Sequence, residues 1–194
     1  MPELSTSEEL RLADATSTFF RLISLDRVWT TVGRRPGLNT HDVSVLNSVV
    51  DQMNTLVRYA VEAAREIVTL AIQASPPAGL PDLTLLDPTV SQVFQSLLNR
   101  DGGVIGIAQQ SYNTLSKISE QEVIEINRQM NILQEGGHIE ADLSRRFMCN
   151  LAKSLMAAGG VTIWVPPHVH AVASISAGAA IYNTNRCWEM EPAV

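Results

Sequence analysis

The sequence has few charged residues for its length. Aspartate, glutamate, lysine and arginine make up 18% of the 194 residues, whereas soluble domains average about 25%. The hydrophobic share of 45% is ordinary for a folded domain, and the length suffices for one domain with its own core. A domain with so few charges has little with which to cover its surface. We therefore expect part of that surface to be buried against other copies of the chain.

Positive charge is scarcer than negative charge. The 14 lysines and arginines face 20 aspartates and glutamates, which gives a formal net charge of −6. The basic doublets, Arg34-Arg35 and Arg145-Arg146, are not part of a basic run with interleaved aromatic residues. Because binding along DNA or RNA phosphates needs a dense positive face, the sequence does not indicate a nucleic-acid partner.

The sequence also lacks the segments that direct a chain into a membrane. No window offers the roughly 20 uninterrupted apolar residues of an ordinary transmembrane helix, and the polar, acidic start "MPELSTSEEL" is unlike a signal peptide. The two cysteines, Cys149 and Cys187, each stand alone without a CxxC motif. A disulfide between them requires an oxidising compartment. We expect a cytoplasmic protein with reduced thiols.

Motifs for catalysis are missing as well. The sequence contains no GxSxG or SxxK motif, no P-loop and no GxGxxG turn. The glycine-rich stretch "DGGVIG" (101–106) precedes a helix, but no strand comes before it and no lysine follows it directly, as a P-loop requires. A turn with a helix cap explains this stretch better than an anion site does. We expect neither an enzyme nor a cofactor.

What the sequence has in abundance is helical periodicity. A first helix is expected from about Ser5 to Trp29, because Ser5 and Glu8 form a capping box. The residues "GRRPGLN" (33–39), with two glycines and a proline, then interrupt the helix. Its apolar face is predicted to hold Leu12, Phe19, Phe20, Ile23 and Val28.

The clearest signal follows a predicted cap, formed by Asn39 with Asp42, and continues to Ala74. Apolar residues recur there at alternating spacings of three and four. They are Leu46, Val49, Met53, Leu56, Ala60, Ala63, Ile67 and Leu70, with Val50, Val57, Ala64 and Ala71 beside them. So wide a stripe predicts one long amphipathic helix with neighbours on two sides, as in a bundle.

Proline and glycine mark the next boundaries. Prolines in the connection 75–87 end the long helix, and Asp87-Pro88 begins a helix that "NRDGG" (99–103) ends. Residues 104–135 again show helical periodicity, with two apolar stripes that are out of register. They form either one long helix with a change of register or two helices with a kink at "SEQE" (119–122), which is itself a capping box.

The whole pattern predicts an all-α fold. We expect a bundle of about six helices in a single domain (1–194), with two long amphipathic helices and an irregular Gly/Pro-rich segment near the C-terminus. A further helix is expected at 139–158, and residues 159–194 form a C-terminal packing segment and tail. The one β-like run, "VTIWV" (161–165), has no partner strand.

Residues 159–182, "GGVTIWVPPHVHAVASISAGAAIY", allow three interpretations. Small side chains let a helix approach a neighbour closely, so a tightly packed segment comes first. A membrane-active hairpin over 161–182 comes second. A metal enzyme with ligands at His168 and His170 comes third, because two such residues face the same side of a strand but not of a helix. The other candidate ligands lie far off in the sequence: His41, His138, Cys149 and Cys187.

Long helices, low charge and the missing motifs together predict a self-assembling structural subunit of the capsid, filament or ribbon type. Copies would bury helix stripes that one chain cannot cover. The expected interface consists of Leu46, Val49, Met53, Leu56, Ile67, Leu70, Ala177, Gly178, Tyr182 and Trp188. Gly178→Leu is expected to block assembly by preventing close helix approach. The alternative is a pore-forming or membrane-active protein that uses residues 161–182, and only in that case is a membrane a partner.

Overall fold

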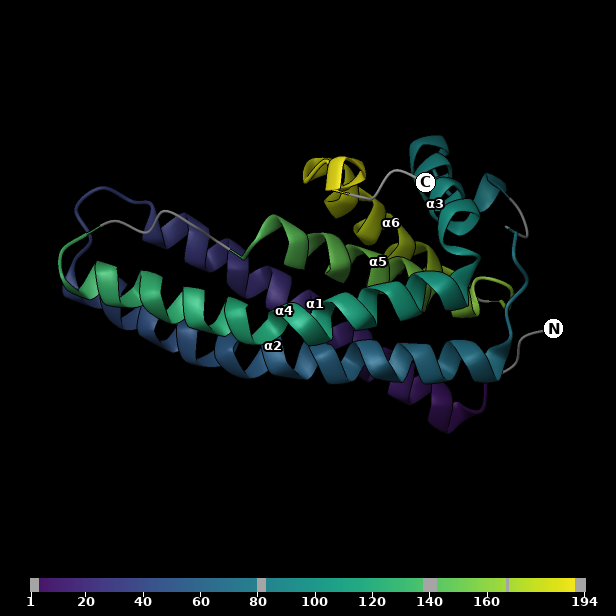
Figure 1. The fold of residues 1–194 in the computed structure, drawn as a ribbon, viewed down its shortest axis with the longest axis horizontal. Coiled ribbons are helices and arrows are strands. Elements are labelled where there is room, and N and C mark those ends of the chain that lie inside the picture. Colours follow the sequence, from purple (N-terminus) through teal and green to yellow (C-terminus); the bar gives the residue numbers. More distant parts are fainter. Residues whose placement is uncertain (1–3, 80–82, 138–142, 167, 191–194) are drawn as a thin grey trace.

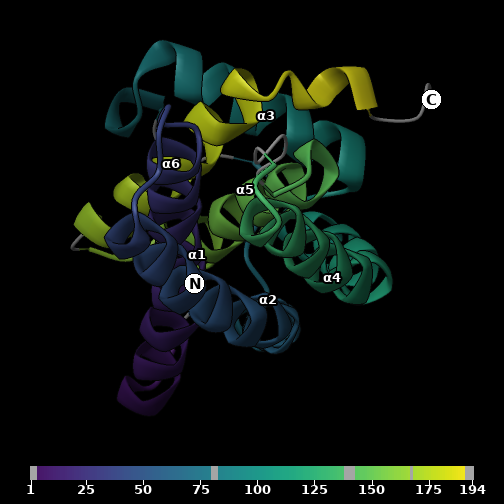
Figure 2. The same cartoon turned by 90° about the vertical axis from the view of Figure 1, so that its left-hand side faces the viewer.

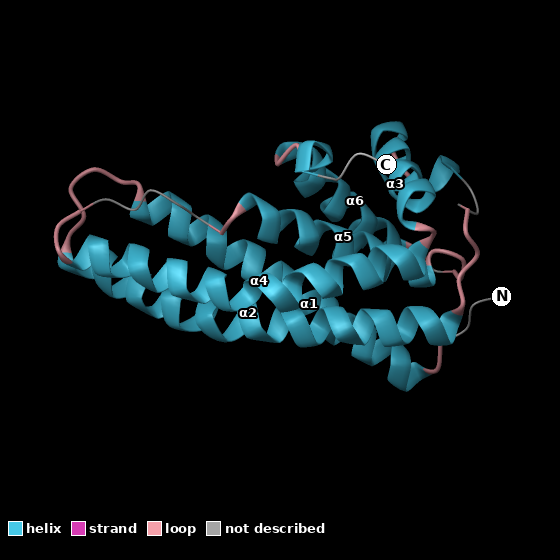
Figure 3. Cartoon of the chain, viewed as in Figure 1, coloured by secondary structure: helices cyan, strands magenta, loops and turns pink. Residues whose placement is uncertain are grey.

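The computed structural model describes residues 4–79, 83–137, 143–166 and 168–190. These residues contain helices and no strand (Figure 3), which confirms the predicted all-α bundle of about six helices. The α-helices are α1 (Thr6–Gly33), α2 (Thr40–Ala74), α3 (Pro88–Asp101), α4 (Val104–Gln134), α5 (Arg145–Thr162) and α6 (Val169–Thr184), and two short 3₁₀-helices are η1 (Leu83–Leu85) and η2 (Cys187–Met190).

Four of the helices form an elongated bundle in which successive members, α1, α2, α4 and α5, alternate in direction (Figure 1). The most extensive contacts inside it join α1 with α2 and α2 with α4. The remaining helices lie outside this bundle, with α6 packed along α5 and α3 across one end, as the view along the bundle in Figure 2 also shows. The chain therefore builds a bundle with an added layer over α5.

The predicted starts of α1 and α2 are confirmed at the level of individual hydrogen bonds, whereas the capping box predicted at 119–122 lies inside α4 and starts no helix. The Ser5 hydroxyl accepts from the Glu8 amide at 3.2 Å, and the Glu8 carboxylate accepts from the Ser5 amide at 2.9 Å. Hydrogen bonding from Ser5, chiefly its backbone, lowers the pKa of Glu8. Asn39 and Asp42 make the same reciprocal pair at the start of α2. Each box satisfies amides that a helix start leaves without an intrahelical partner.

The apolar face of α1 was predicted incorrectly at two positions. Phe20 and Val28 are 39% and 37% exposed, whereas Leu22 and Trp29 are fully buried. Neighbouring residues on a helix point about 100° apart, and Phe20 lies outside the buried stripe that contains Leu12, Ala15, Phe19 and Leu22. The β-like run at 161–165 forms no strand, because Val161 and Thr162 end α5 and a turn follows.

The predicted stripe of α2 is buried inside one chain. Its members are at most 7% exposed, and α1, α4 and α5 all contact the helix. The idea that a single chain leaves this stripe uncovered is therefore wrong. A wide stripe needs neighbours on two sides, and this chain supplies them itself.

The two out-of-register stripes of 104–135 belong to one continuous helix, α4. Ser111 lies within the first stripe and Ser119 lies between the two stripes. Both are buried at positions that an apolar pattern does not reveal. The Ser111 hydroxyl lies 2.8 Å from the Ser154 hydroxyl of α5 and bonds to the Ala108 carbonyl at 3.0 Å. Burial of the Ser111 and Ser154 hydroxyls is tolerated because they are hydrogen-bonded.

The most deeply buried helix is α5, whose residues 147–161 are all buried. Its start was expected at 139, but residues 138–142 lie outside the described part of the chain. Two buried carboxylates from other helices hold that start. Asp26 of α1 accepts from the Leu143 amide at 3.0 Å, and Glu122 of α4 accepts from the Ser144 amide at 3.1 Å. A carboxylate is stabilised near the N-terminus of a helix, because that end carries a partial positive charge.

A lysine lies within this buried stretch. The ammonium of Lys153 is 3.7 Å from a carboxylate oxygen of Asp101, the last residue of α3, and the two side chains are 6% and 5% exposed. A buried charge needs a partner of opposite sign. The pair therefore ties the end of α3 to the middle of α5.

Lys153→Met is expected to lower the free energy of unfolding by about 3–5 kcal/mol, because it leaves the Asp101 carboxylate buried without its cation. Urea unfolding at neutral pH measures the loss. Lys117→Met, at an exposed position of α4, is the matched control and should change stability by less than about 0.5 kcal/mol. Adding Asp101→Asn to Lys153→Met should restore part of the loss. Equal stability of the two lysine variants would contradict a stabilising pair.

Candidate functional site

The inner face of α6 packs closely on α5, and small residues make this approach possible. A Cβ atom added to Gly178 would lie 2.6 Å from the Ala152 carbonyl oxygen of α5. Conversely, a Cβ added to Gly159 would lie 2.6 Å from the Ala171 carbonyl oxygen of α6. Between these contacts, the Ser174 hydroxyl of α6 donates to a backbone carbonyl of α5 at 2.7 Å. The two antiparallel helices therefore touch backbone to backbone.

Most of the residues expected at an interface between copies lie inside a single chain. Gly178 faces α5, so a leucine there would disrupt the packing of one chain before it could affect assembly. A second copy cannot reach the buried members on α2 while the chain keeps this fold. Those members are Leu46, Val49, Met53, Leu56, Ile67 and Leu70.

The outer face of α6 remains open. Val169 is 71% exposed, Ala173 and Ala180 are exposed, and Ser176 and Ala177 are half-buried. No residue of α6 from Val169 to Thr184 carries an acidic, lysine or arginine side chain. The helix thus presents a smooth, uncharged surface to solvent, which we call the outer face of α6.

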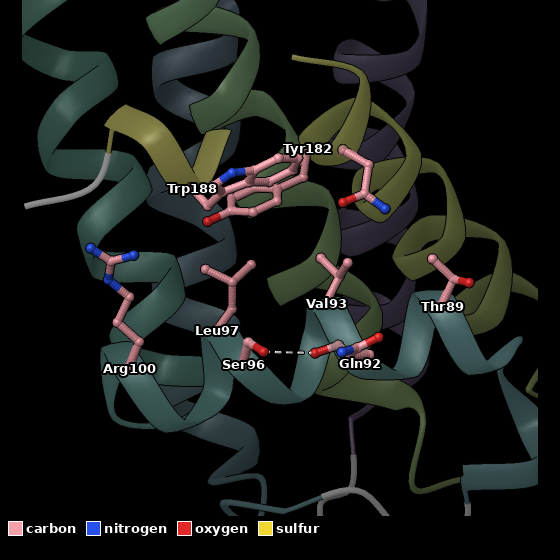
Figure 4. A pocket seen from close by; sticks show the side chains of 9 residues that line it. Thr89, Gln92, Val93, Ser96, Leu97, Arg100, Tyr182 and Trp188 are labelled. Carbon is pink, nitrogen blue, oxygen red and sulfur yellow. Dashed lines mark hydrogen bonds between the residues drawn. The ribbon is translucent and has the colours of Figure 1, made fainter. Parts of the chain in front are cut away.

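Tyr182 and Trp188, also expected at an interface, come together in a groove of about 340 Å³ between α3, α6 and η2. Figure 4 shows the Trp188 indole lying over the Tyr182 ring, with Val93 and Leu97 pointing toward the pair from α3. We call this the α3–α6 groove. It is lined by Thr89, Gln92, Val93, Ser96, Leu97, Arg100, Tyr182, Asn183 and Trp188.

The charge of the α3–α6 groove differs from that of the whole chain. Among the described residues that line it there is no carboxylate, and Arg100 is the charged one. The chain as a whole has a net charge of −6. Glu125 of α4 is not among the described lining residues. Hydrogen bonds from Arg128 and then Gln129 lower the pKa of its carboxyl group to about 2. The described wall of the groove therefore offers a guanidinium as its one formally charged group.

The α3 side of this groove was not among the predicted interface residues. Gln92, Ser96 and Arg100 recur every four residues along that helix, so they lie on one side of it. This polar side was visible in the sequence, but an exposed polar face is ordinary for a surface helix. Only the position of η2 across from it makes the face one wall of a groove.

The other wall is held by a disulfide. Cys149 of α5 and Cys187 of η2 are bonded, with Cα atoms 5.6 Å apart. This bond contradicts the expectation of reduced thiols. The cytoplasmic location stays a prediction, and the disulfide weighs against it because reducing compartments seldom sustain such bonds.

Arg145 adds a second tie to η2. Its guanidinium donates to the Arg186 carbonyl and to the Glu189 carboxylate, both at 2.8 Å. Trp188 lies between these anchored neighbours. The indole is therefore fixed at the edge of the groove even though 49% of the residue's surface is exposed.

The two histidines considered as metal ligands lie at the start of α6. His168 directly precedes the helix, and His170 is exposed in its first turn. In the described part of the chain, no three histidine, cysteine, aspartate or glutamate residues are grouped as metal ligands. Nor does any helix among those residues combine the length and apolar character needed to cross a membrane.

Removing the disulfide is expected to lower the free energy of unfolding by about 4 kcal/mol, since the bond closes a loop between residues 38 apart in the sequence. Urea unfolding of the wild type with and without a phosphine reductant measures this loss. The Cys149→Ala/Cys187→Ala variant should have the same free energy of unfolding as the reduced wild type, and the reductant should not change its unfolding curve. Identical curves for oxidised and reduced wild type would count against the bond as a stabilising tie.

Gly178→Ala should lower the free energy of unfolding by about 1–3 kcal/mol, because the new methyl group has no space beside Ala152 and Met156. Ala13→Leu, at an exposed position of α1, is the control and should change stability by less. Thermal unfolding followed by circular dichroism compares the two variants. If Gly178→Ala is the more stable of the pair, α5 and α6 do not pack as closely as described.

No family model, curated protein or solved structure matches this chain. Its function must therefore be inferred from its own surfaces. Two surfaces of the described residues are open to solvent and distinctive: the outer face of α6, which has no acidic, lysine or arginine side chain, and the aromatic α3–α6 groove.

Proposed function

We propose that this chain is a structural subunit that associates with copies of itself, and that the outer face of α6 makes the contact. The observation that carries the proposal is the lack of charge along this exposed helix. The centres of protein interfaces are depleted of charged residues, because burying an unpaired charge is costly. The stripe of α2 has no part in this contact, since it is buried in one chain.

The spacing of the exposed residues suits a second helix. Val169, Ala173, Ser176 and Ala180 follow one another at intervals of four, three and four. Residues spaced in this way form one seam along a helix. Because most of them are small, a partner helix can approach to the short end of the usual interaxial range, about 8 Å.

A two-fold symmetric pair is the simplest arrangement, because homodimers most often use one self-complementary surface. In an antiparallel pair centred between Ser176 and Ala177, Ala173 of one copy lies opposite Ala180 of the other. Val169 then lies opposite Thr184. The residues paired along this seam are uncharged, so their contact buries no ion without a partner.

A two-fold contact closes on itself and yields a dimer. Growth into a capsid, filament or ribbon requires a second contact between dimers. The low charged share of the sequence, 18%, supports further surface burial, and exposed apolar side chains such as Tyr59, Ile72 and Ile124 are available for it.

The mass of the protein in solution tests the proposal. Light scattering on the size-exclusion peak should give a multiple of 21.2 kDa for the wild type. Ala173→Glu/Ala180→Glu should give the monomer, because four carboxylates would meet in the antiparallel pair. Ala13→Glu, at an exposed position of α1, is the matched control and should assemble like the wild type.

Two results would overturn the proposal. One is a wild-type mass of 21.2 kDa across the accessible range of concentrations. The other is an unchanged oligomer in the Ala173→Glu/Ala180→Glu variant, which would locate the contact elsewhere. Negative-stain microscopy of the same fractions separates a closed dimer from a regular particle or fibre.

A further inference from the structure

We propose that the α3–α6 groove binds a small ligand that has a planar aromatic body and one acidic group. The groove lies on the α3 side of α6, whereas the self-association proposed above uses the outer face of that helix. The two proposals therefore depend on different residues and can fail independently.

The size of the groove suits a small molecule. Its volume of about 340 Å³ lies at the lower end of the range for ligand sites, about 300–1,000 Å³. It follows α3 from Thr89 to Arg100, which is roughly 16 Å of helix. A ligand of one or two fused rings with a short substituent fits such a groove better than a protein domain does.

The aromatic wall favours a planar ligand. The outer part of the Trp188 indole is open to solvent, while the Tyr182 ring beneath it is nearly buried. Stacking on an aromatic side chain contributes about 0.5–1.5 kcal/mol beyond the buried area. Since η2 is anchored by the disulfide and by Arg145, little conformational freedom is lost when a ligand stacks on Trp188.

Hydrogen-bonding groups line the groove beside the apolar residues. The Ser96 hydroxyl donates to the Gln92 backbone carbonyl at 2.9 Å. The side-chain amides of Gln92 and Asn183 make no hydrogen bond within the described part of the chain, and both residues line the groove. Each amide supplies donors and an acceptor to a ligand.

Charge decides between a neutral and an anionic ligand. Arg100 extends from α3 at the end of the groove near Trp188 (Figure 4), and the described lining residues include no carboxylate. A guanidinium has five donors and can keep an existing partner while it binds an acid group. Its charge-assisted hydrogen bonds favour a ligand with an acidic substituent over a neutral one. The ligand class that fits is an aryl carboxylate or an aryl sulfonate.

A pair of fluorescent probes tests the proposal. The anion 1-anilinonaphthalene-8-sulfonate and the neutral N-phenyl-1-naphthylamine share one ring system and differ by the sulfonate. Titrated into the folded full chain at low salt, the sulfonate should bind at one saturable site, about tenfold more tightly than the neutral probe, as expected for a charge-assisted hydrogen bond. Binding should also quench tryptophan emission, and Trp188→Phe should remove most of the quenching.

Arg100→Gln should weaken the sulfonate about tenfold and leave the neutral probe unchanged. Arg21→Gln, at an exposed position of α1, is the matched control and should leave both affinities unchanged. Val93→Glu places a carboxylate in the groove and should abolish sulfonate binding. Near-ultraviolet circular dichroism of each variant verifies that the fold is kept, so that a loss of binding is not a loss of structure.

Equal affinity of the two probes for the wild type, or an unchanged sulfonate affinity in Arg100→Gln, would overturn the proposal. So would strong sulfonate binding by Val93→Glu, because the probe would then occupy another apolar surface. Ala173→Glu/Ala180→Glu should bind the sulfonate like the wild type whether or not it dimerises. That variant separates a failure of this proposal from a failure of self-association.

Discussion

The structure depends on the burial of α5 on every side. Fifteen consecutive residues of this helix, 147–161, are buried, so each polar side chain among them needs a partner. Asp101 supplies one for Lys153, and Ser111 supplies one for Ser154. The same constraint explains the small residues where α6 crosses, because two helices whose backbones touch have no space for larger side chains.

Burying α5 and the α2 stripe in one chain leaves a particular surface. The strongest apolar pattern of the sequence is used for folding, and the uncharged face of α6 is among the surfaces that remain outside. A helix that contacts its own chain through glycine and serine on one side can also present alanine and serine on the other. Folding and proposed association thus draw on the same composition of small residues, placed on opposite sides of one helix.

The α3–α6 groove is a consequence of how the added layer is held. One wall, α3, is tied to α5 by the buried ion pair at its last residue. The other wall, η2, is tied to α5 by the disulfide and to its start by Arg145. Because both walls are fixed to one buried helix, the distance between them does not depend on their limited contact with each other. Such preorganisation is what a small binding site requires.

Local chemistry explains what could be predicted from the sequence alone. Capping boxes, proline stops and the three-four spacing of α2 act within a few residues of the chain, and they determined the helices and much of the core. The exposure of Phe20, the polar core position at Ser119 and the pairing of Cys149 with Cys187 were decided only by the tertiary structure. The α3 wall beside Tyr182 and Trp188 belongs to this second group. Each depends on which distant helix lies opposite, and that choice results from packing all the helices around α5 at once.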